Sequence, residues 1–258
     1  MIPLLLQPLT GLHVLVTRPA AQSEVLSNDL QAAGAQVTRW PALQIVPLNY
    51  ALPETRYDLL IFVSANAVQH GQNLLTQQPQ ARLAAVGPTT AAALHTLGQR
   101  VDAVPEQGAD SEALLAHPLL QPPPPHILLV RGQGGRELLR DELRARGSQV
   151  TVLETYTRQM TQPDAAAVHA LQQALQDELI DIVTATSVDV LHALHTQLGD
   201  CLLQPGLTLL AGSARIAQAA LDMGWPGEYV LARSPQDRDL LTALSLWHAR
   251  QRNLKLVR

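Results

Sequence analysis

The sequence contains two gapless copies of one segment, HVLVTRPAAQSEVLSNDLQAAGAQVT at residues 13–38 and HILLVRGQGGRELLRDELRARGSQVT at residues 126–151. Eleven of the 26 aligned pairs are identical, among them Arg18 with Arg131. Shared composition does not place so many identities in one register. We therefore infer an internal duplication, which is the sequence signature of a repeated structural unit.

Each copy has the pattern of a buried strand, a turn, an amphipathic helix, a glycine and a second strand. In the second copy, Leu138, Leu139 and Leu143 are spaced to form one apolar helix face, and Gly147 stands where a left-handed C-cap residue is expected. Strands that alternate with helices of about ten residues indicate parallel sheets covered by helices. The sequence therefore predicts an α/β fold, present twice.

Further blocks extend the repeat, and their offsets drift because the loops between them differ in length. Residues 58–64 match 181–187 at an offset of 123, residues 86–90 match 211–215 at 125, and residues 110–114 match 237–241. The apolar-alternating segments 40–48 and 152–160 are expected to pair as a connector. We expect two similar parallel-sheet α/β domains joined by a two-stranded β connector, with a cleft between them.

The composition narrows the class of protein. Apolar residues make up 47% and charged residues 16%, which excludes disorder, and a net charge of −4 gives no general attraction to nucleic acid. A single cysteine, Cys201, excludes a disulfide framework and favours a reducing compartment. No stretch approaches the roughly 18 apolar residues of a membrane span, and the opening MIPLLLQPLTGL lacks a basic leader. We expect a soluble, cytoplasmic protein with no membrane contact.

Polar residues follow the predicted strands, at the turns where α/β sheets bind ligands. Thr17 and Arg18 follow the first strand, and Arg131 and Gly132 follow its counterpart in the second copy. A guanidinium group and the N–H groups of a helix N-terminus can together bind a carboxylate. For one arginine alone, a surface ion pair is the alternative interpretation. Two arginines at matching strand ends favour anion binding.

Two further kinds of turn carry hydroxyl and amide groups. Ser64, Asn66 and Ser187 follow buried strands, where their side chains either cap the next helix or donate to a ligand. The remaining candidates follow glycines that permit close backbone approach, and this set comprises Gly87, Thr89, Thr90, Ser213, Ala214 and Arg215. All these turns together predict a binding site for an anionic ligand.

The sequence lacks the residue patterns of metal sites, nucleotide sites and common nucleophilic hydrolases. His192 and His195 have helical spacing but no third ligand, so no metal is expected. The turn at residues 132–135 lacks the Lys-Ser/Thr of a phosphate loop and the GxGxxG pattern of a dinucleotide site, so we expect no nucleotide cofactor. The GxSxG motif of hydrolases is absent, and Cys201 has no paired base.

Six segments resemble uroporphyrinogen-III synthases along nearly the whole chain, in order and spacing: VLVTRP, FVSANAV, AAVGPTTAAAL, ADSEALL, LLVRGQGGRELL and LETYTR. The resemblance implies one domain of residues 1–39 with 158–258, an inserted domain of residues 43–155, and an active cleft between them. It also implies a reaction without cofactors, in which hydroxymethylbilane is cyclised to uroporphyrinogen III with loss of water and inversion of ring D.

The resemblance assigns roles to particular residues. Tyr156, in LETYTR, matches the family's tyrosine thought to assist departure of the hydroxyl group, and packing of its ring is the alternative. The turn residues would bind the acetate and propionate groups of the substrate. The chain departs from the commoner family pattern at residues 213–215 and 185–188, which makes the transfer of roles to Ser213 and Ser187 less direct. The implied partners are the substrate and the preceding enzyme, hydroxymethylbilane synthase, with the chain acting as a monomer.

Two other classes of protein stay open. A two-domain module that binds a small anion without catalysis would need the same cleft and no catalytic group, and an export signal or a regulatory fusion would favour it. Neither feature is visible in the sequence. A nucleotide-using transferase would need a phosphate loop, which the turn after Arg131 does not provide.

Overall fold

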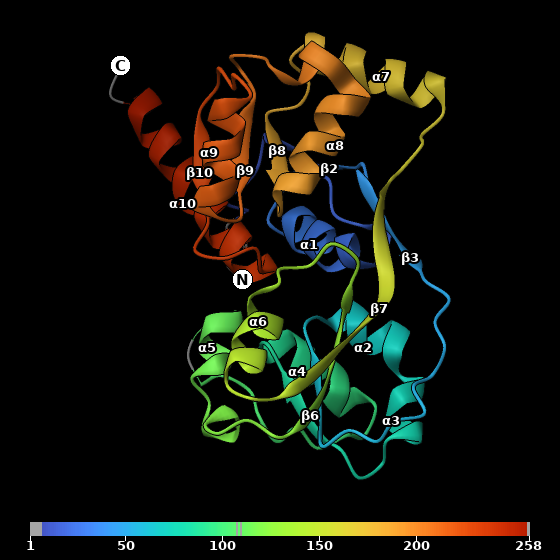
Figure 1. Cartoon of the computed structure of the whole chain (residues 1–258). Coiled ribbons are helices and arrows are strands. Elements are labelled where there is room, and N and C mark those ends of the chain that lie inside the picture. The colour runs from blue at the N-terminus through green and yellow to red at the C-terminus, as the bar shows by residue number, and fades with distance from the viewer. Residues whose placement is uncertain (1–6, 107, 109, 257–258) are drawn as a thin grey trace. The chain divides into compact units, whose positions relative to one another are not determined.

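The structure is a computed structural model that describes residues 7–106, 108 and 110–256 (Figure 1). The first half of the opening segment, residues 1–6, lies outside this range. The chain divides into two compact units: Met1–Gln44 with Met160–Arg258, called unit 1, and Ile45–Gln159, called unit 2. Within the described residues, no helix is long and apolar enough to cross a membrane.

Unit 1 is built on a five-stranded sheet in the order β10-β9-β8-β1-β2. Its strands are β1 (His13–Val16), β2 (Gln36–Arg39), β8 (Ile182–Ala185), β9 (Thr208–Ala211) and β10 (Tyr229–Leu231). All neighbouring strands run parallel. Numbered within the unit, this is the 2-1-3-4-5 order of one common doubly wound sheet, which binds ligands beyond the carboxyl ends of its strands.

Helices cover both faces of the unit 1 sheet, because successive strand residues point to opposite sides. These helices are α1 (Ala20–Ala32), α7 (Ala165–Gln176), α8 (Val188–Leu198), α9 (Ala214–Asp222) and α10 (Asp237–Leu256), and a short 3-10 helix, η2 (Gly199–Leu202), follows α8. Leu15 and Val183 pack against α7, α8 and α9, whereas their neighbours Val14 and Ile182 pack against α1 and α10. The near-continuous apolar strands therefore supply two cores.

Unit 2 repeats this topology in a sheet of order β3-β7-β6-β4-β5. Its strands are β3 (Leu43–Pro47), β4 (Leu59–Phe62), β5 (Arg82–Ala85), β6 (His126–Gly132) and β7 (Gln149–Met160). Its helices are α2 (Ala65–Gly71), α3 (Asn73–Gln77), α4 (Pro88–Thr96), α5 (Ser111–Leu115) and α6 (Leu138–Ala145), with a 3-10 turn η1 (Pro118–Leu120). The parallel order β7-β6-β4-β5 reproduces β2-β1-β8-β9 of unit 1.

The predicted duplication is confirmed by hydrogen bonds that recur in both units. The Asp181 carboxylate accepts the His13 backbone N–H at 2.7 Å, and the Asp58 carboxylate accepts the His126 N–H at 2.9 Å. After the first helix of each copy, Gly34 and Gly147 have φ values of 95° and 96°. Both glycines are thus in the left-handed conformation, which the sequence predicted for Gly147 at the end of its helix.

One register of the sequence repeat was wrong by a single residue. The sequence paired Gly87 with Gly212, but Gly87 is the N-cap residue of α4 and Ser213 is the N-cap residue of α9. Val86 and Gly212 are the residues that each donate an N–H to the end of the neighbouring strand. The structurally equivalent residues are therefore offset by 126 positions. The alignment by sequence was one residue short because it matched one glycine with another.

The predicted connector is present as strands β3 and β7, which are neighbours in one sheet. The Leu48 N–H donates to the Thr155 carbonyl, and the Thr161 N–H donates to the Ala42 carbonyl, each at 3.0 Å. Residue numbers increase along β3 in the direction in which they decrease along β7, so the two strands are antiparallel. Both strands continue from one unit into the other, so they are the two covalent links between the units.

Candidate functional site

The predicted site residues lie at or just beyond the carboxyl ends of the parallel strands, in one group per unit. Unit 1 holds Thr17, Arg18, Ser187, Ser213, Ala214 and Arg215. Unit 2 holds Ser64, Asn66, Gly87, Thr89, Thr90, Arg131, Gly132 and Tyr156. Because parallel strands end at a common edge, each group is gathered along one edge of its sheet.

Ser64 and Ser187 are helix caps. The Ser64 hydroxyl accepts the Ala67 N–H at 3.1 Å at the start of α2, and the Ser187 hydroxyl accepts the Val190 N–H at 3.2 Å at the start of α8. The capping interpretation is therefore confirmed at both equivalent positions. Asn66 is half-buried in the first turn of α2.

The N-cap residue of α4 is Gly87, which has no side chain, and the N-cap residue of α9 is Ser213, whose hydroxyl makes no capping hydrogen bond. In these first turns Thr90 is buried, whereas the candidate residues Thr89, Ala214 and Arg215 are exposed. The first N–H groups of a helix have no partner within the helix and carry a partial positive charge. These two helix starts are accordingly suited to accept a carboxylate.

Thr17 is fully buried and belongs to the sheet. Its hydroxyl donates to the Thr184 carbonyl at 2.6 Å, and its N–H donates to the Thr184 hydroxyl at 3.2 Å. These bonds join the ends of β1 and β8. The Thr17 side chain therefore stabilises the edge of the sheet on which the other candidates lie.

Arg18 forms an ion pair with Asp237 at the start of α10 and donates to the Pro235 carbonyl. Burial lowers the pKa of Arg18, and the Asp237 carboxylate partly offsets that effect. Burial also raises the pKa of Asp237, with Arg18 opposing the shift. Ion pairing, the alternative interpretation of Arg18, is thus what the structure shows, in a largely buried setting.

Arg131 is held in the same way at the equivalent position of unit 2. Its guanidinium Nη2 lies 2.8 Å from the Glu137 carboxylate and 3.3 Å from the Glu154 carboxylate, while Nη1 donates to the Gly135 carbonyl at 3.1 Å. The hydrogen bond to Glu137 is the largest cause of a raised Arg131 pKa. Both matched arginines therefore tie the end of a strand to a nearby loop.

The structure brings Tyr156, Ser64 and Gly132 together. The Tyr156 side chain is 1% exposed, and its hydroxyl lies 3.0 Å from the Ser64 Oγ. A Cβ atom added to Gly132 would lie 2.5 Å from the Tyr156 Cζ, so the ring occupies the space of the missing side chain. The Arg158 guanidinium lies 5.7 Å from the ring centroid, within cation–π range. The ring is thus packed inside unit 2.

Sequence reasoning did not identify Asp237, Glu154 and Arg158 as parts of these edges. In the sequence, Asp237 is visible only as the first residue of the repeated block 237–241, and no local pattern links it to Arg18. Arg158 follows Tyr156 by two positions, so both side chains lie on one face of β7. In the described part of the chain, no group of three or more His, Cys, Asp or Glu side chains could hold a metal ion.

Two parallel-sheet units of one topology, joined by two antiparallel strands and carrying polar groups at the strand ends, define a duplicated α/β protein with two sheet domains. A family model described as "Uroporphyrinogen-III synthase HemD" matches residues 24–241. The chain is 34% identical over 250 residues to the uroporphyrinogen-III synthase of Escherichia coli (strain K12), covering 90% of this chain and 100% of that protein. The chain belongs to the uroporphyrinogen-III synthase family.

Another relative agrees with this assignment, and two solved structures have a similar fold. The uroporphyrinogen-III synthase of Salmonella typhimurium (strain LT2) is 32% identical over 252 residues, which is 90% of this chain and 100% of that one. The Helicobacter pylori enzyme structure has a TM-score of 0.63 at 16% identity, covering 91% of this chain and 99% of its own. A mutant Thermus thermophilus uroporphyrinogen III synthase has a TM-score of 0.57 at 18% identity, covering 92% and 99%. These structures share the fold.

Proposed function

We propose that the chain catalyses the uroporphyrinogen-III synthase reaction, in which hydroxymethylbilane loses water and closes to uroporphyrinogen III with ring D inverted. The observation that carries this proposal is the 34% identity that extends over the whole length of the Escherichia coli enzyme. The reaction is that of a cyclising hydro-lyase in tetrapyrrole and heme biosynthesis. The proposal includes a monomer acting in the cytoplasm without a cofactor, supplied with substrate by hydroxymethylbilane synthase.

The proposed reaction does not require a strongly catalytic side chain. Departure of the terminal hydroxyl group leaves a cation that the pyrrole nitrogens delocalise, so the substrate supplies the electrons. The protein must bind the carboxylates, fold the linear chain and prevent direct closure. Helix N-termini at the strand ends of both units support carboxylate binding in a chain whose net charge is −4.

We propose that units 1 and 2 are the two domains of the family, with bounds near 1–39 plus 158–258 and 43–155. The compact units end within β3 and β7, a few residues from those bounds. The exposed groups at the helix starts, such as Thr89 and Arg215, are the proposed first contacts with the substrate. Arg18 and Arg131 would bind a carboxylate only by exchanging their present carboxylate partners for it.

The proposed catalytic residue is Tyr156, as a donor to the departing hydroxyl group. Its phenol is already hydrogen-bond partner to Ser64, at the edge where the other unit 2 candidates lie. Because the side chain is almost fully covered, contact with substrate requires a covering group to move, and the exposed Arg158 side chain over the ring is the one best placed to do so.

Isomer analysis tests the proposed function. Purified protein, with no added metal or nucleotide, is mixed with freshly prepared hydroxymethylbilane, and the I and III isomers are separated by chromatography. We expect isomer III from the native protein and isomer I from the heat-denatured control. If the well-folded protein yields isomer I alone, the proposal is wrong, and tight binding without isomer III would instead identify an anion-binding module.

A further inference from the structure

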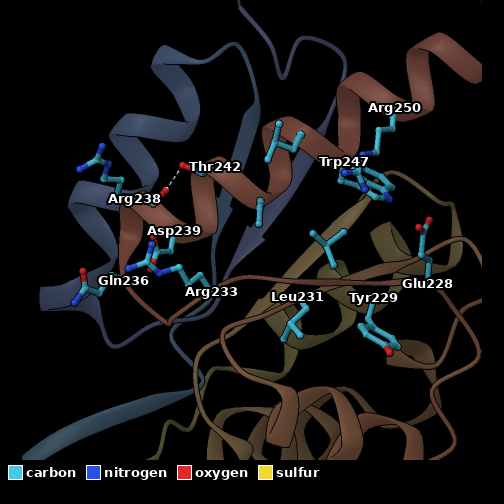
Figure 2. A pocket seen from close by; sticks show the side chains of 13 residues that line it. Glu228, Tyr229, Leu231, Arg233, Gln236, Arg238, Asp239, Thr242, Trp247 and Arg250 are labelled. Carbon is cyan, nitrogen blue, oxygen red and sulfur yellow. Dashed lines mark hydrogen bonds between the residues drawn. The ribbon is translucent and has the colours of Figure 1, made fainter. Parts of the chain in front are cut away.

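A groove of about 820 Å³ lies between the edge strand β10 and helix α10 in unit 1 (Figure 2). Tyr229 and Leu231 line it from the strand, and Leu246 and Trp247 line it from the helix. None of the candidate site residues lines this groove. It is therefore a feature that the proposed reaction does not use.

The strand side of the groove presents unpaired backbone groups. β10 is the edge strand of its sheet and pairs only with β9. The Glu228 carbonyl and the Ala232 N–H bond to β9, so the alternate residues Tyr229 and Leu231 direct their N–H and carbonyl groups to the free edge. These groups can accept one more strand.

The side chains along this edge are apolar and uncovered. Tyr229 is 44% exposed, Leu231 is 47% exposed and Leu246, across the groove on α10, is 58% exposed. Sheet edges in proteins that avoid association are usually shielded by charged residues, proline or a covering segment. An edge that exposes tyrosine and leucine has the character of a docking surface for another chain.

Three arginines line the groove beside these apolar side chains. Arg233, Arg238 and Arg250 line the groove, and none of them has an ion-pair or hydrogen-bond side-chain partner among the residues that the structure describes. The groove also holds two carboxylates, Glu228 and Asp239, which accept hydrogen bonds from the neutral side chains of Gln251 and Ser234, so the three arginines leave the lining with an excess of positive charge. Charge complementarity therefore calls for an acidic occupant.

The spacing of the arginines selects an extended occupant over a small anion. Arg238 and Arg250 are twelve residues apart on α10, which corresponds to about 18 Å along the helix axis. One carboxylate or phosphate cannot reach both. An extended chain of about six residues spans that length, and its alternate side chains point to one face.

We propose that this groove binds an extended acidic segment of another protein, which pairs with the free edge of β10. Its backbone would bond to Tyr229 and Leu231. Because Val230 packs against α10, the alternate side chains of Tyr229 and Leu231 lie on the other face of the sheet, where they would meet the apolar side chains of the segment. Its carboxylates would face α10 and the arginines. This mode of recognition, strand addition at a sheet edge, derives affinity from main-chain bonds and specificity from alternate side chains.

The probe is a fluorescent peptide of about six residues in which Glu alternates with Val, titrated with the full-length protein and followed by anisotropy. We expect saturable binding that weakens with added salt, and no binding of a peptide in which Lys replaces Glu. Leu231→Glu and Arg250→Glu should each weaken binding by about tenfold or more.

Matched variants separate the groove from general surface effects. Leu221 is 46% exposed on α9 and Arg252 is exposed on α10, and neither lines the groove. Leu221→Glu and Arg252→Glu should leave peptide binding within about twofold of wild type. The Leu231 N–H points to the free edge and makes no bond to β9, so Leu231→Pro removes only a group that the peptide would use. We therefore expect Leu231→Pro to bind the peptide more weakly than Leu231→Ala, with the pairing of β10 and β9 unchanged.

Several outcomes would overturn the proposal. If the Lys peptide binds as tightly as the Glu peptide, apolar contacts alone explain the binding and the arginines have no role. If Leu231→Glu binds the Glu peptide as tightly as wild type does, the peptide binds elsewhere on the protein. Displacement by citrate, beyond that caused by chloride of equal ionic strength, would make the groove a small-anion site. A concentration-dependent dimer abolished by Leu231→Glu would make a second copy of this chain the occupant.

Discussion

Gly132 and Tyr156 illustrate, at the scale of single residues, how a missing side chain fixes the place of another. The Tyr156 ring lies where a Gly132 Cβ would be, and its hydroxyl reaches Ser64 at the adjacent strand end. A glycine that had been chosen from the sequence as a ligand-binding position is thus required first for packing. Its backbone φ is not positive, so the requirement is one of space and not of conformation.

Removal of the Tyr156 hydroxyl should affect turnover only moderately. Tyr156→Phe keeps the ring against Gly132 but loses the contact with Ser64. Because the substrate ionises readily, we expect kcat to fall by about tenfold or less, below the roughly 10²–10⁴-fold typical of general acid catalysis, with KM little changed. Steady-state kinetics with fresh hydroxymethylbilane measures both constants.

Gly132→Ala is the control that keeps the hydroxyl and displaces the ring. The overlap should cost about 1–3 kcal/mol of unfolding free energy, measured by urea titration. If Tyr156→Phe turns over at the wild-type rate while Gly132→Ala is destabilised, Tyr156 is a packing residue. A hundredfold loss in Tyr156→Phe with unchanged stability would instead place proton transfer on this hydroxyl.

The strand-end positions of the candidate residues could be predicted from the sequence, but their partners could not. Ser64, Ser187 and the two arginines lie at or just beyond strand ends, as predicted. The Asp237 partner of Arg18 is 219 positions away along the chain, and no local pattern encodes such a contact. Packing of the Tyr156 ring was one of two interpretations open from the sequence, but its place against Gly132, the last residue of β6, could not be predicted because the two residues are 24 positions apart.

The Arg18–Asp237 pair acts at the scale of secondary-structure elements, since it joins the end of β1 to the start of α10. Both pKa shifts are dominated by burial, so each charge loses hydration that the ion pair only partly restores. Asp237→Leu alone would leave the Arg18 charge buried without a carboxylate. We expect a loss of about 1–3 kcal/mol in unfolding free energy.

The double variant Arg18→Met with Asp237→Leu should recover most of that loss, because neither charge then remains buried. Urea unfolding of the two single variants and the double variant measures this coupling. A double variant whose loss equals the sum of the two single losses would show that the pair does not act as a unit.

The pH dependence follows from the raised pKa of Asp237. A carboxyl group with a folded pKa above its unfolded value stabilises the fold most when protonated, below the unfolded pKa of about 3.9. That contribution is lost as the pH rises through the folded pKa. The stability of wild type relative to Asp237→Asn should therefore increase as the pH falls, and the opposite trend would contradict the assigned burial.

Elements were predicted well where periodicity was strong and less well where loops differ. Leu139 and Leu143 are buried on α6 as the apolar pattern indicated, with Leu138 partly buried beside them. The helix begins at Leu138, whereas α1 begins at Ala20, which aligns with Gln133. Gly134, with φ of 73°, and Gly135 interrupt the first turn, so a loop replaces it. Glycine content decides this difference between the copies.

At the scale of the whole molecule, each unit contains its own cores. Residues of unit 1 form two apolar clusters on the two faces of its sheet, and residues of unit 2 form two more. Unit 2 is one continuous segment, Ile45–Gln159, whereas unit 1 is interrupted by it. The antiparallel bonds of the connector bring Ala42 beside Thr161, so the interruption can be closed by a short hairpin.

The two units should therefore fold separately and fail to catalyse separately. We expect residues 45–159 alone, and unit 1 with Asn-Gly joining Gln44 to Met160, each to show α/β circular dichroism and a cooperative thermal transition. Because the proposed substrate contacts are divided between the strand ends of both units, neither should produce isomer III from hydroxymethylbilane. A folded single unit that forms isomer III would confine the active site to that unit, and a unit that stays unfolded would show that the connector strands hold more than a covalent link.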